Sequence, residues 1–417
     1  MSEINHVLPL REQDRVIYKT LEERFAIILP AAMREAGIDM WVILCQEDDP
    51  DPVFRTMLPL NCWTPILQML VFFDRGEQGI ERLNISMTDM QGLFDSPWKG
   101  RNYWEQWEFL AEVIRQRNPQ KIGLNIGKIQ WAAGGLTHNL YLQFMDAIDA
   151  EYRARIVDAE KVCTRWLMTF SENEKEVYQQ VVSLAHQVMA RCFSRQTITP
   201  GVTSTIDLEW AYWQLVHDLG LEVSFKPFFR IIRSNADQAK YPVADGIIRS
   251  GDMLHCDVGI RYLRLCSDHQ ELAYVLRPEE TDAPAGIKNL LAQNNRLQQV
   301  FLNGFKRSLT GDQMLKNMLT EAQAQGIPGP KIYSHSLGLY LHEPGPLIGL
   351  PWEQGSNPGR GDVVLEYDSG FTMELSIEDV VPEWDNQLIR AGTEQDVLFT
   401  RTGCRAVDGL QTELHLI

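Results

Sequence analysis

Hydrophobic residues recur at two different spacings along the first 158 residues of the chain. Helical spacing extends over residues 12–36, 103–117 and 136–148. Short apolar runs of strand length occupy residues 40–45, 68–73, 79–85, 121–126 and 154–157. The alternation of these two kinds of element predicts a small α/β domain with a mixed sheet over residues 1–158.

The remaining residues, 159–417, group their elements differently. Ser171 and Glu174 form a Ser-x-x-Glu pattern that predicts the start of a helix, and apolar residues then repeat at helical spacing as far as residue 188. Further elements are predicted as helices near residues 206–219, 285–308 and 312–324 and as strands near residues 223–232, 253–260, 266–276 and from 332 onward. Runs of helices beside runs of strands are typical of an α+β domain.

Composition agrees with two globular domains and limits the partners. The chain has 417 residues, of which 44 % are hydrophobic and 23 % are charged, which is enough for two ordinary cores. The formal net charge of -17 argues against a nucleic-acid partner, because phosphate binding needs a basic surface. Apolar stretches are too short to cross a bilayer, and the N-terminus lacks the pattern of a secretory signal, so we expect no membrane partner.

The cysteines indicate the compartment. There are seven of them, an odd number, and their spacing matches no disulfide framework. This favours reduced thiols and therefore a cytoplasmic protein. We expect all seven to serve as small, buried hydrophobic residues.

Five residues in the second half of the chain form a set that suits metal ions. Asp257 and Asp268 lie eleven residues apart, and His335, Glu374 and Glu394 follow in apolar strand contexts. A hairpin whose turn is centred between residues 262 and 263 would make the two aspartates direct cross-strand neighbours, with Cβ atoms roughly 4.5–5.5 Å apart. Four carboxylates balance the charge of two divalent ions, so the set predicts a dinuclear metal site and a metal-dependent hydrolase.

The order of these residues resembles that in the pita-bread metallopeptidases, the family of methionine aminopeptidase, Xaa-Pro aminopeptidase, prolidase and the non-metal relative creatinase. Residues 251–268, from Gly-Asp-Met-Leu-His-Cys-Asp-Val-Gly to Ser-Asp, look like the aspartate hairpin of that family. The segment from His335 to His342-Glu-Pro-Gly-Pro looks like its histidine motif, and Phe-Thr-Met-Glu374 and Glu394-Gln-Asp-Val-Leu look like its last two ligand motifs. The resemblance covers residues 160–417 and implies an N-terminal creatinase-like domain followed by a pita-bread catalytic domain.

This resemblance also implies roles for the residues. Asp257, Asp268 and Glu394 would hold one metal ion, and Asp268, His335 and Glu374 would hold the other, with Asp268 and Glu394 bridging. Glu374 would move the proton from the attacking water to the leaving amine. A sixth residue, His342, would contact the substrate carbonyl or the tetrahedral oxyanion.

The same resemblance implies the activity and the cofactor. We expect an Xaa-Pro aminopeptidase or dipeptidase that acts on a peptide or small amide and forms a homodimer. Hard oxygen ligands favour two manganese ions, with cobalt, iron or zinc as substitutes.

Several positions depart from the family pattern. The histidine that the family carries upstream of the first aspartate is absent, and Lys240 and Tyr241 stand in that stretch, so we expect one of them to hydrogen-bond the substrate. Gln270 replaces a threonine, and Gly392 stands where the family has an arginine. The neighbouring His255 shares a strand face with Asp257 by alternation, although ordinary packing is the simpler expectation for it.

These departures keep two other functions open. One is a different reaction on the same scaffold, a non-peptide amidohydrolase or a lyase, which the missing histidine and the replaced threonine favour. The other is a catalytically dead binding or scaffold protein. The complete ligand set argues against that second alternative, because five buried ionisable groups cost stability when no metal is bound.

Overall fold

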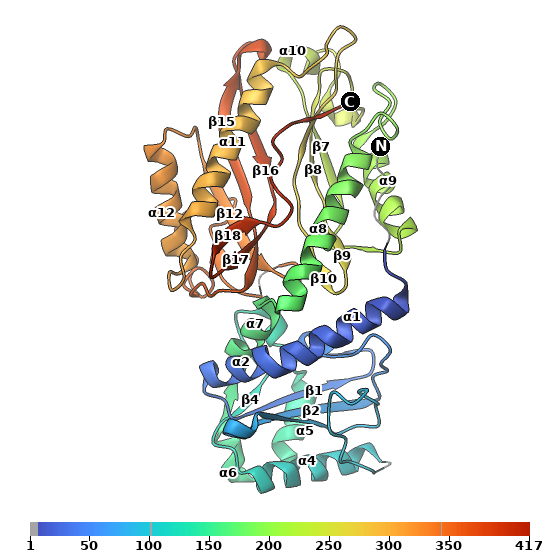
Figure 1. Ribbon diagram of the computed structural model, residues 1–417, viewed down its shortest axis with the longest axis vertical. Helices are drawn as coiled ribbons and strands as arrows, with labels where there is room; N and C mark the ends of the chain where they lie inside the picture. The colour runs from blue at the N-terminus through green and yellow to red at the C-terminus, as the bar shows by residue number, and fades with distance from the viewer. Residues whose placement is uncertain (1–6, 101, 343) are drawn as a thin grey trace. The chain divides into compact units, whose positions relative to one another are not determined.

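The computed structural model describes residues 7–100, 102–342 and 344–417 (Figure 1). Glu343 of the histidine motif and the N-terminal residues used to predict the absence of a signal lie outside the described residues. The chain divides into two compact units, residues 8–174 and residues 175–417, the second of which also takes in residue 7. The predicted domain boundary after residue 158 stays a prediction. Helix α7 (Glu160–Met168) lies between the two positions and packs on α2 (Leu29–Ala36) of the first unit.

The first unit is built on a mixed five-stranded sheet, as predicted. Its strands lie in the order β3-β2-β1-β4-β5, with β1 antiparallel to β2 and parallel to β4. The strands are β1 (Met40–Gln46), β2 (Leu67–Asp74), β3 (Ile80–Asn84), β4 (Ile122–Leu124) and β5 (Ile156–Asp158). The other elements, besides α2 and α7, are α1 (Leu10–Glu23), a π-helical turn η1 (Arg24–Ile28), α3 (Pro52–Arg55), η2 (Gly76–Gln78), α4 (Tyr103–Arg117), η3 (Trp131–Ala133), α5 (His138–Ala147) and α6 (Ala150–Arg153).

Helices cover both faces of this sheet, which explains why its central strand β1 is apolar at every position from Met40 to Cys45. Val42 of β1 belongs to a core that includes Leu110 of α4 and residues of α5. The next residue back, Trp41, points to the other face and contacts Phe72, with ring centroids 5.3 Å apart. Phe72 in turn contacts Phe25 of the π-helical turn, which interrupts the helical pattern predicted over residues 12–36.

The second unit contains three further sheets and their helices. Its strands are β6 (Glu222–Val223), β7 (Phe228–Ile232), β8 (Met253–Asp257), β9 (Ile260–Tyr262), β10 (Leu265–Cys266), β11 (Leu272–Tyr274), β12 (Lys331–Leu337), β13 (Leu347–Ile348), β14 (Ser369–Thr372), β15 (Glu374–Val381), β16 (Gln387–Thr393), β17 (Asp396–Thr400), β18 (Gly403–Ala406) and β19 (His415–Leu416). The helical elements are α8 (Glu172–Cys192), α9 (Thr205–Asp218), α10 (Asn235–Gln238), η4 (Val243–Asp245), α11 (Ala285–Gly304), α12 (Gly311–Ala324) and η5 (Pro382–Trp384).

Two of these sheets meet where the candidate ligands lie. One has the order β19-β11-β8-β7, and the largest runs β16-β15-β12-β14-β17-β18 with β13 beside β12. An isolated bridge joins Gln270 to Glu394, with the Glu394 amide donating to the Gln270 carbonyl at 2.8 Å and the Gln270 amide returning a bond of 3.1 Å. Helix α11 packs along β15 and β16 and covers the large sheet, as Figure 1 shows.

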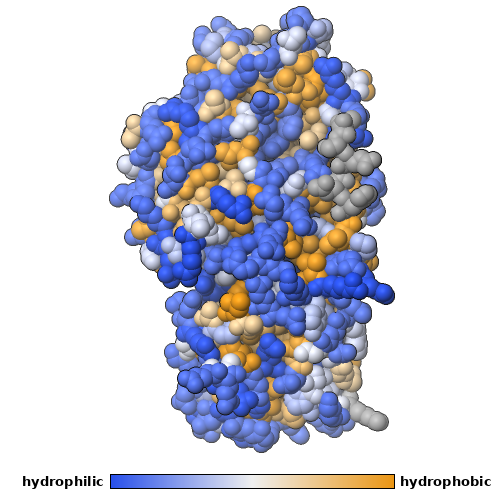
Figure 2. Space-filling view, in the orientation of Figure 1, coloured by the Kyte–Doolittle hydropathy of each residue, from blue (hydrophilic) through white to orange (hydrophobic). Residues whose placement is uncertain are grey.

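The surface and the cysteines give two further results. Hydrophilic and hydrophobic side chains are interspersed on the face of the molecule that Figure 2 shows. Among the residues that the structure describes, none of the helices has the length and apolar character needed to span a membrane. The seven cysteines, all described, form no disulfide; five are buried, and Cys62 and Cys404 are partly exposed.

A buried ion pair within the unit of residues 8–174 involves Glu174, the last residue of that unit and the third residue of α8. The Glu174 carboxylate accepts a hydrogen bond of 2.6 Å from the Arg24 guanidinium, and both side chains are at most 3 % exposed. Glu174 also accepts from the backbone amide of Ser171 at 2.8 Å, while the Ser171 hydroxyl accepts from the Glu174 amide. The capping box predicted from these two residues is therefore confirmed, and its glutamate also neutralises a buried arginine.

Replacing Glu174 with alanine should destabilise the protein by about 3–5 kcal/mol, because Arg24 would keep its charge in the interior without a counter-ion. Urea unfolding followed by tryptophan fluorescence measures this loss. Asp282→Ala is the matched control, since it removes the partner of Lys288 from an exposed pair and should leave the unfolding midpoint almost unchanged. Equal midpoints for the two variants would contradict the role given to the buried pair.

Candidate metal centre

The five predicted ligands lie in strands of the second unit or within two residues of them. Asp257 ends β8, Asp268 lies two residues after β10, His335 lies within β12, Glu374 begins β15 and Glu394 follows β16. Asp268, His335 and Glu394 are buried, whereas Asp257 and Glu374 are partly exposed. Segments far apart in the sequence therefore bring all five to the junction of the sheets.

The hairpin that carries the two aspartates has a different register from the one predicted. Tyr262 pairs with Leu265, so the turn consists of Leu263 and Arg264 rather than being centred between residues 262 and 263. Both turn residues have positive φ, 50° and 69°, as a two-residue type I′ turn requires. The prediction was wrong because neither residue is of the Asn or Gly type that usually marks such a turn.

The corrected register moves the aspartates from direct to diagonal neighbours. Val258 pairs with His269, which places Asp257 opposite Gln270 and Asp268 one alternate position away. A shift of two residues keeps side chains on the same face, so both carboxylates still point to the same side of the hairpin. The metal-site prediction therefore does not depend on the register error.

Two groups of potential ligand atoms share one residue. One ligand atom from each of Asp257, Asp268 and Glu394 lies within 4.8 Å of the others, and the same holds for Asp268, His335 and His342. Asp268 is common to both groups, which is the position of a bridging carboxylate. Glu374 belongs to neither group but lines the adjoining cavity together with Asp257.

Mutual repulsion and burial perturb the carboxylates. Burial, with the neighbouring Asp268, raises the pKa of Asp257 to about 8, and burial raises the pKa of Asp268 to about 8. Burial followed by the two aspartates raises the pKa of Glu374 to about 7, and burial with the same neighbours raises the pKa of Glu394 well above its usual range. One oxygen each of Asp268 and Glu394 is buried without a hydrogen-bond partner in the described chain. Divalent cations would stabilise the ionised carboxylates and would contact the oxygens that have no hydrogen-bond partner, so the donor set fits them.

The imidazoles near this cluster are held in the neutral form. Burial lowers the pKa of His335 to about 4, and its Nδ1 lies 3.3 Å from the Ser336 carbonyl oxygen, which leaves Nε2 facing Asp268 at 3.6 Å. A neutral imidazole oriented in this way can ligate a metal. Burial and His335 lower the pKa of His342 to about 4 as well, and the two ring centroids are 4.8 Å apart. The geometry thus places His342 beside the candidate ligands His335 and Asp268.

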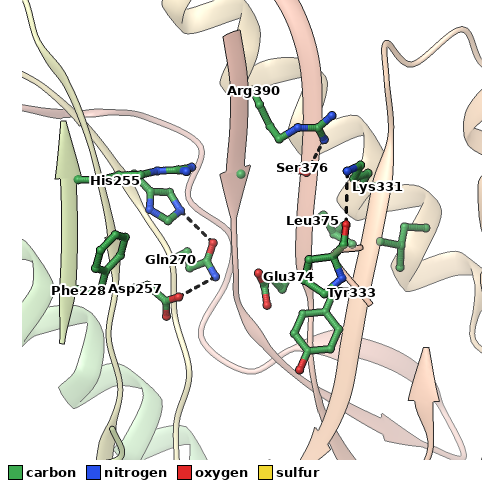
Figure 3. A pocket seen from close by; sticks show the side chains of 14 residues that line it. Phe228, His255, Asp257, Gln270, Lys331, Tyr333, Glu374, Leu375, Ser376 and Arg390 are labelled. Carbon is green, nitrogen blue, oxygen red and sulfur yellow. Dashed lines mark hydrogen bonds between the residues drawn. The ribbon is translucent and has the colours of Figure 1, made fainter. Parts of the chain in front are cut away.

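Gln270 connects a buried histidine to the first aspartate. Its amide nitrogen donates to Asp257 Oδ2 at 3.3 Å, and its amide oxygen lies 2.9 Å from His255 Nε2, as Figure 3 shows. Burial lowers the pKa of His255 to about 3, so this imidazole is neutral and its Nε2–H donates to the amide. The glutamine that replaces the family threonine therefore fixes the orientation of Asp257. Strand alternation had placed His255 on the same face as Asp257, but ordinary packing was the expectation for it, and its contact with Gln270 was not predicted.

Asp396, which the sequence argument missed, holds the backbone of Asp268 in place. Asp396 is fully buried, and its oxygens lie 3.3 Å from the Asp268 backbone nitrogen, which donates to them. The Tyr178 hydroxyl donates to the same carboxylate at 2.7 Å. Burial raises the pKa of Asp396 well above its usual range. The pattern Glu394-Gln-Asp396 was visible, but only the fold shows that Asp396 meets the backbone of Asp268.

A cavity of about 310 Å³ adjoins the cluster. Figure 3 shows Phe228, His255 and Asp257 on one wall and Tyr333 and Glu374 on the other. Side chains on its walls that the sequence argument did not select are Phe228, Arg230, Lys331, Tyr333, Ser376 and Arg390. The one sequence signal for any of them was a charged residue, Arg230, within the otherwise apolar run Phe228–Ile232.

Lys240 and Tyr241 do not line this cavity. Strand β7 pairs Phe228 with Asp257 and Ile232 with Met253, so the chain after β7 lies at the far end of β8 from Asp257. Lys240 is exposed there, and the Tyr241 ring is 49 % exposed. The substrate contact predicted for these two residues has no support from the lining of the cavity, because the antiparallel register carries them away from it.

Fold and site together define a two-domain α+β protein with a carboxylate-rich metal centre. Residues 176–401 match the model of Metallopeptidase family M24, which is more than half of the chain. The chain therefore belongs to this family, and the predicted resemblance is confirmed.

Similar proteins agree with this assignment. A Mycoplasma pneumoniae protein named "Putative Xaa-Pro aminopeptidase" is 24 % identical over 210 residues, which are 50 % of this chain and 56 % of that protein. The match thus spans little more than half of the curated relative. Two solved structures have similar folds. The X-Pro aminopeptidase from Thermotoga maritima has a TM-score of 0.64 and 16 % identity, and the match covers 93 % of this chain and 100 % of that one. The Xaa-Pro dipeptidase from Bacillus anthracis has a TM-score of 0.62 and 19 % identity, and the match covers 96 % of this chain and 100 % of that one. They confirm the predicted fold class.

The metal-free protein should lose stability as the pH rises from about 6.5 to about 8. In this interval the folded chain retains protons on Asp257 and Asp268 that the unfolded chain, with ordinary pKa values near 4, has already released. A carboxyl group whose pKa is higher in the folded chain than in the unfolded chain contributes stability that is complete below the unfolded-state pKa. This stability is lost as the pH rises through the folded-state pKa. Below about 6.5 the neutral histidines act in the opposite sense, because the unfolded chain protonates them first.

Thermal unfolding of chelator-treated protein at a series of pH values measures this effect. Added divalent ions should abolish the fall in Tm, because they replace the protons. A Tm of the chelated protein that stays level or rises between pH 6.5 and 8 would show that the carboxylates are already compensated by the chain itself.

Proposed function

We propose that this chain is a dinuclear metal-dependent peptidase that cleaves Xaa-Pro bonds, as an aminopeptidase or dipeptidase. One observation carries the proposal: Asp268 belongs to both groups of ligand atoms within a chain of family M24. A shared carboxylate is what holds two ions close enough to act on one substrate atom.

The residues present fit two divalent ions. Asp257, Asp268 and Glu394 would hold one, and Asp268, His335 and Glu374 the other. Carboxylate oxygens outnumber the single imidazole, which favours manganese over softer metals, with cobalt, iron or zinc as substitutes. When bound, these ions supply Lewis acidity and a nucleophilic water at neutral pH.

Proton transfer falls to Glu374. It begins β15 on the cavity wall opposite Asp257, so its carboxylate faces the space that a scissile bond would occupy (Figure 3). There it can accept a proton from the attacking water and return it to the leaving amine. Its partial burial keeps bulk water from competing for that proton.

Charge that develops on the substrate needs a donor near the ligands. His342 is neutral and lies beside His335, so a ring N–H can donate to the substrate carbonyl oxygen. Gln270 holds Asp257 in a fixed orientation, which keeps the acid cluster aligned while the substrate reacts.

A non-peptide amide is the second candidate substrate. The specific observation in its favour is that neither Lys240 nor Tyr241 lines the cavity, so nothing in that stretch replaces the family's upstream histidine. The same hydrolysis of a carbon–nitrogen bond would then act on an amide other than a peptide.

Reconstitution with manganese should give close to two ions per chain and cleavage of Xaa-Pro peptides. Elemental analysis of the dialysed protein and release of the N-terminal residue from a panel of Xaa-Pro dipeptides and longer peptides measure the two quantities. Two bound ions with no cleavage of any peptide would transfer the assignment to the amidohydrolase alternative. A folded chain that binds no metal would contradict the proposed dinuclear site.

Asp268→Ala and His342→Ala should separate metal binding from substrate binding. Asp268→Ala should lose metal and activity together, because the proposed bridge disappears. His342→Ala should retain both ions and lose about 10²–10³ in turnover, the usual effect of removing a donor to a developing charge. If His342→Ala also loses an ion, this histidine is a ligand, as its proximity to Asp268 and His335 permits.

A further inference from the structure

The cavity beside the acid cluster carries three basic side chains. Arg230 comes from β7, Lys331 from β12 and Arg390 from β16, and all three line the cavity with Asp257 and Glu374. Figure 3 shows Lys331 and Arg390 on the same side as Glu374, across the cavity from Asp257. Basic side chains on both walls of a cavity beside a candidate metal site would repel metal ions, so metal binding does not explain them.

The alternation along β7 directs Arg230 into the cavity. Phe228 and Arg230 are exposed, whereas Phe229 and Ile231 are buried at 4 % and 8 % exposure. Because Phe228 pairs with Asp257, Arg230 lies one alternate position farther along the same face. Within the described parts of the chain, the Arg230 guanidinium has neither a hydrogen bond nor an ion pair, although Asp257 is close enough to favour its charge.

The other two cations differ in how far the protein neutralises them. Arg390 forms an ion pair of 3.0 Å with Glu378 and donates to the Ser376 hydroxyl at 3.1 Å. Lys331 donates only to a backbone carbonyl, that of Pro351, at 3.3 Å, which leaves its charge uncompensated. Arg230 and Lys331 are therefore the two cations that can take an anion from outside the chain.

The acid cluster would no longer serve as the counter-ion of Arg230 and Lys331 once metal is bound. Four carboxylates balance two divalent ions, so the field that offsets Arg230 in the metal-free chain is neutralised. A guanidinium in a partly enclosed cavity then gains most from a planar anion that accepts two parallel hydrogen bonds, which is the geometry of a carboxylate.

We infer that Arg230, assisted by Lys331, forms a subsite that binds a carboxylate of the substrate and thereby selects negatively charged substrates. The inference rests on the proposed function for the place of the scissile bond and adds a specificity determinant to it. The carboxylate comes either from a free C-terminus next to the cleaved bond or from an acidic side chain. Phe228, two residues before Arg230 on the same strand face, supplies an apolar surface for the rest of the substrate.

Binding of small probes to the manganese-loaded protein tests the subsite without requiring turnover. L-proline should bind more tightly than L-prolinamide if a C-terminal carboxylate is read, and L-glutamate more tightly than L-glutamine if an acidic side chain is read. Arg230→Met should weaken binding of the preferred anion about 10- to 100-fold and leave its amide unchanged, because only the charged hydrogen bonds are lost. Lys331→Met should act in the same direction, and Arg230→Lys should restore part of the affinity.

Lys288→Met is the matched control, since it removes one positive charge from an exposed pair on α11 and should change neither probe. Equal affinity of each acid and its amide for the wild-type protein would overturn the inference. The inference would also be overturned if Arg230→Met weakened the binding of the acid and of its amide equally. Arg230 would then only offset the charge of the acid cluster.

Turnover provides the second arm. Ala-Pro compared with Ala-Pro amide, and Glu-Pro amide compared with Gln-Pro amide, should show a higher kcat/KM for the charged member of at least one pair. Arg230→Met should remove that preference by raising KM, with two ions still bound. Failure to cleave any peptide would refute the proposed function while the probe measurements still decide the fate of the subsite. Cleavage of charged and neutral members at equal rates would refute the subsite and leave the peptidase in place.

Discussion

The cost of placing four carboxylates together at the junction of two sheets governs the rest of this structure. Burial raises the pKa values of Asp257, Asp268, Glu374 and Glu394, and repulsion from neighbouring carboxylates adds to the shift at Asp257, Glu374 and Glu394. Such an arrangement is stable only when protons or cations neutralise it. The clustered acids therefore destabilise the metal-free fold, and bound cations would relieve that electrostatic cost.

The surrounding elements hold the acids in place against their repulsion. The bridge between Gln270 and Glu394 ties the two sheets together through backbone hydrogen bonds that carry no charge. Asp268 is fixed from behind by Asp396, and Asp257 is fixed from the side by Gln270. Each of these two aspartates is thus positioned by a buried polar side chain. Rigid ligands lower the cost of reorganisation when metal and substrate bind.

Charge also organises the cavity that adjoins the acids. Its walls carry the acids Asp257 and Glu374 together with the basic side chains Arg230 and Lys331. Under the inference drawn above, bound metal ions would balance the acids and the basic side chains would then select the ligand, so metal binding and substrate selection would be linked. The exposed stretch around Lys240 takes no part in this balance, because the register of β7 and β8 carries it to the other end of the strand.

The sequence alone identified a mixed α/β part followed by an α+β part and the family, and it predicted five candidate metal ligands, four of which belong to the two groups of ligand atoms. It could do so because hydrophobic periodicity is a local property and because the ligand motifs are short and keep their order along the chain. It failed on the turn at Leu263 and Arg264, whose positive φ values no local rule assigns to leucine and arginine. It also could not find Arg230, Tyr333 or Asp396, because their importance arises only when strands distant in sequence lie side by side. Register and sheet junction are products of long-range packing, and they decided which side chains meet the acids and which, such as Tyr241, stay outside.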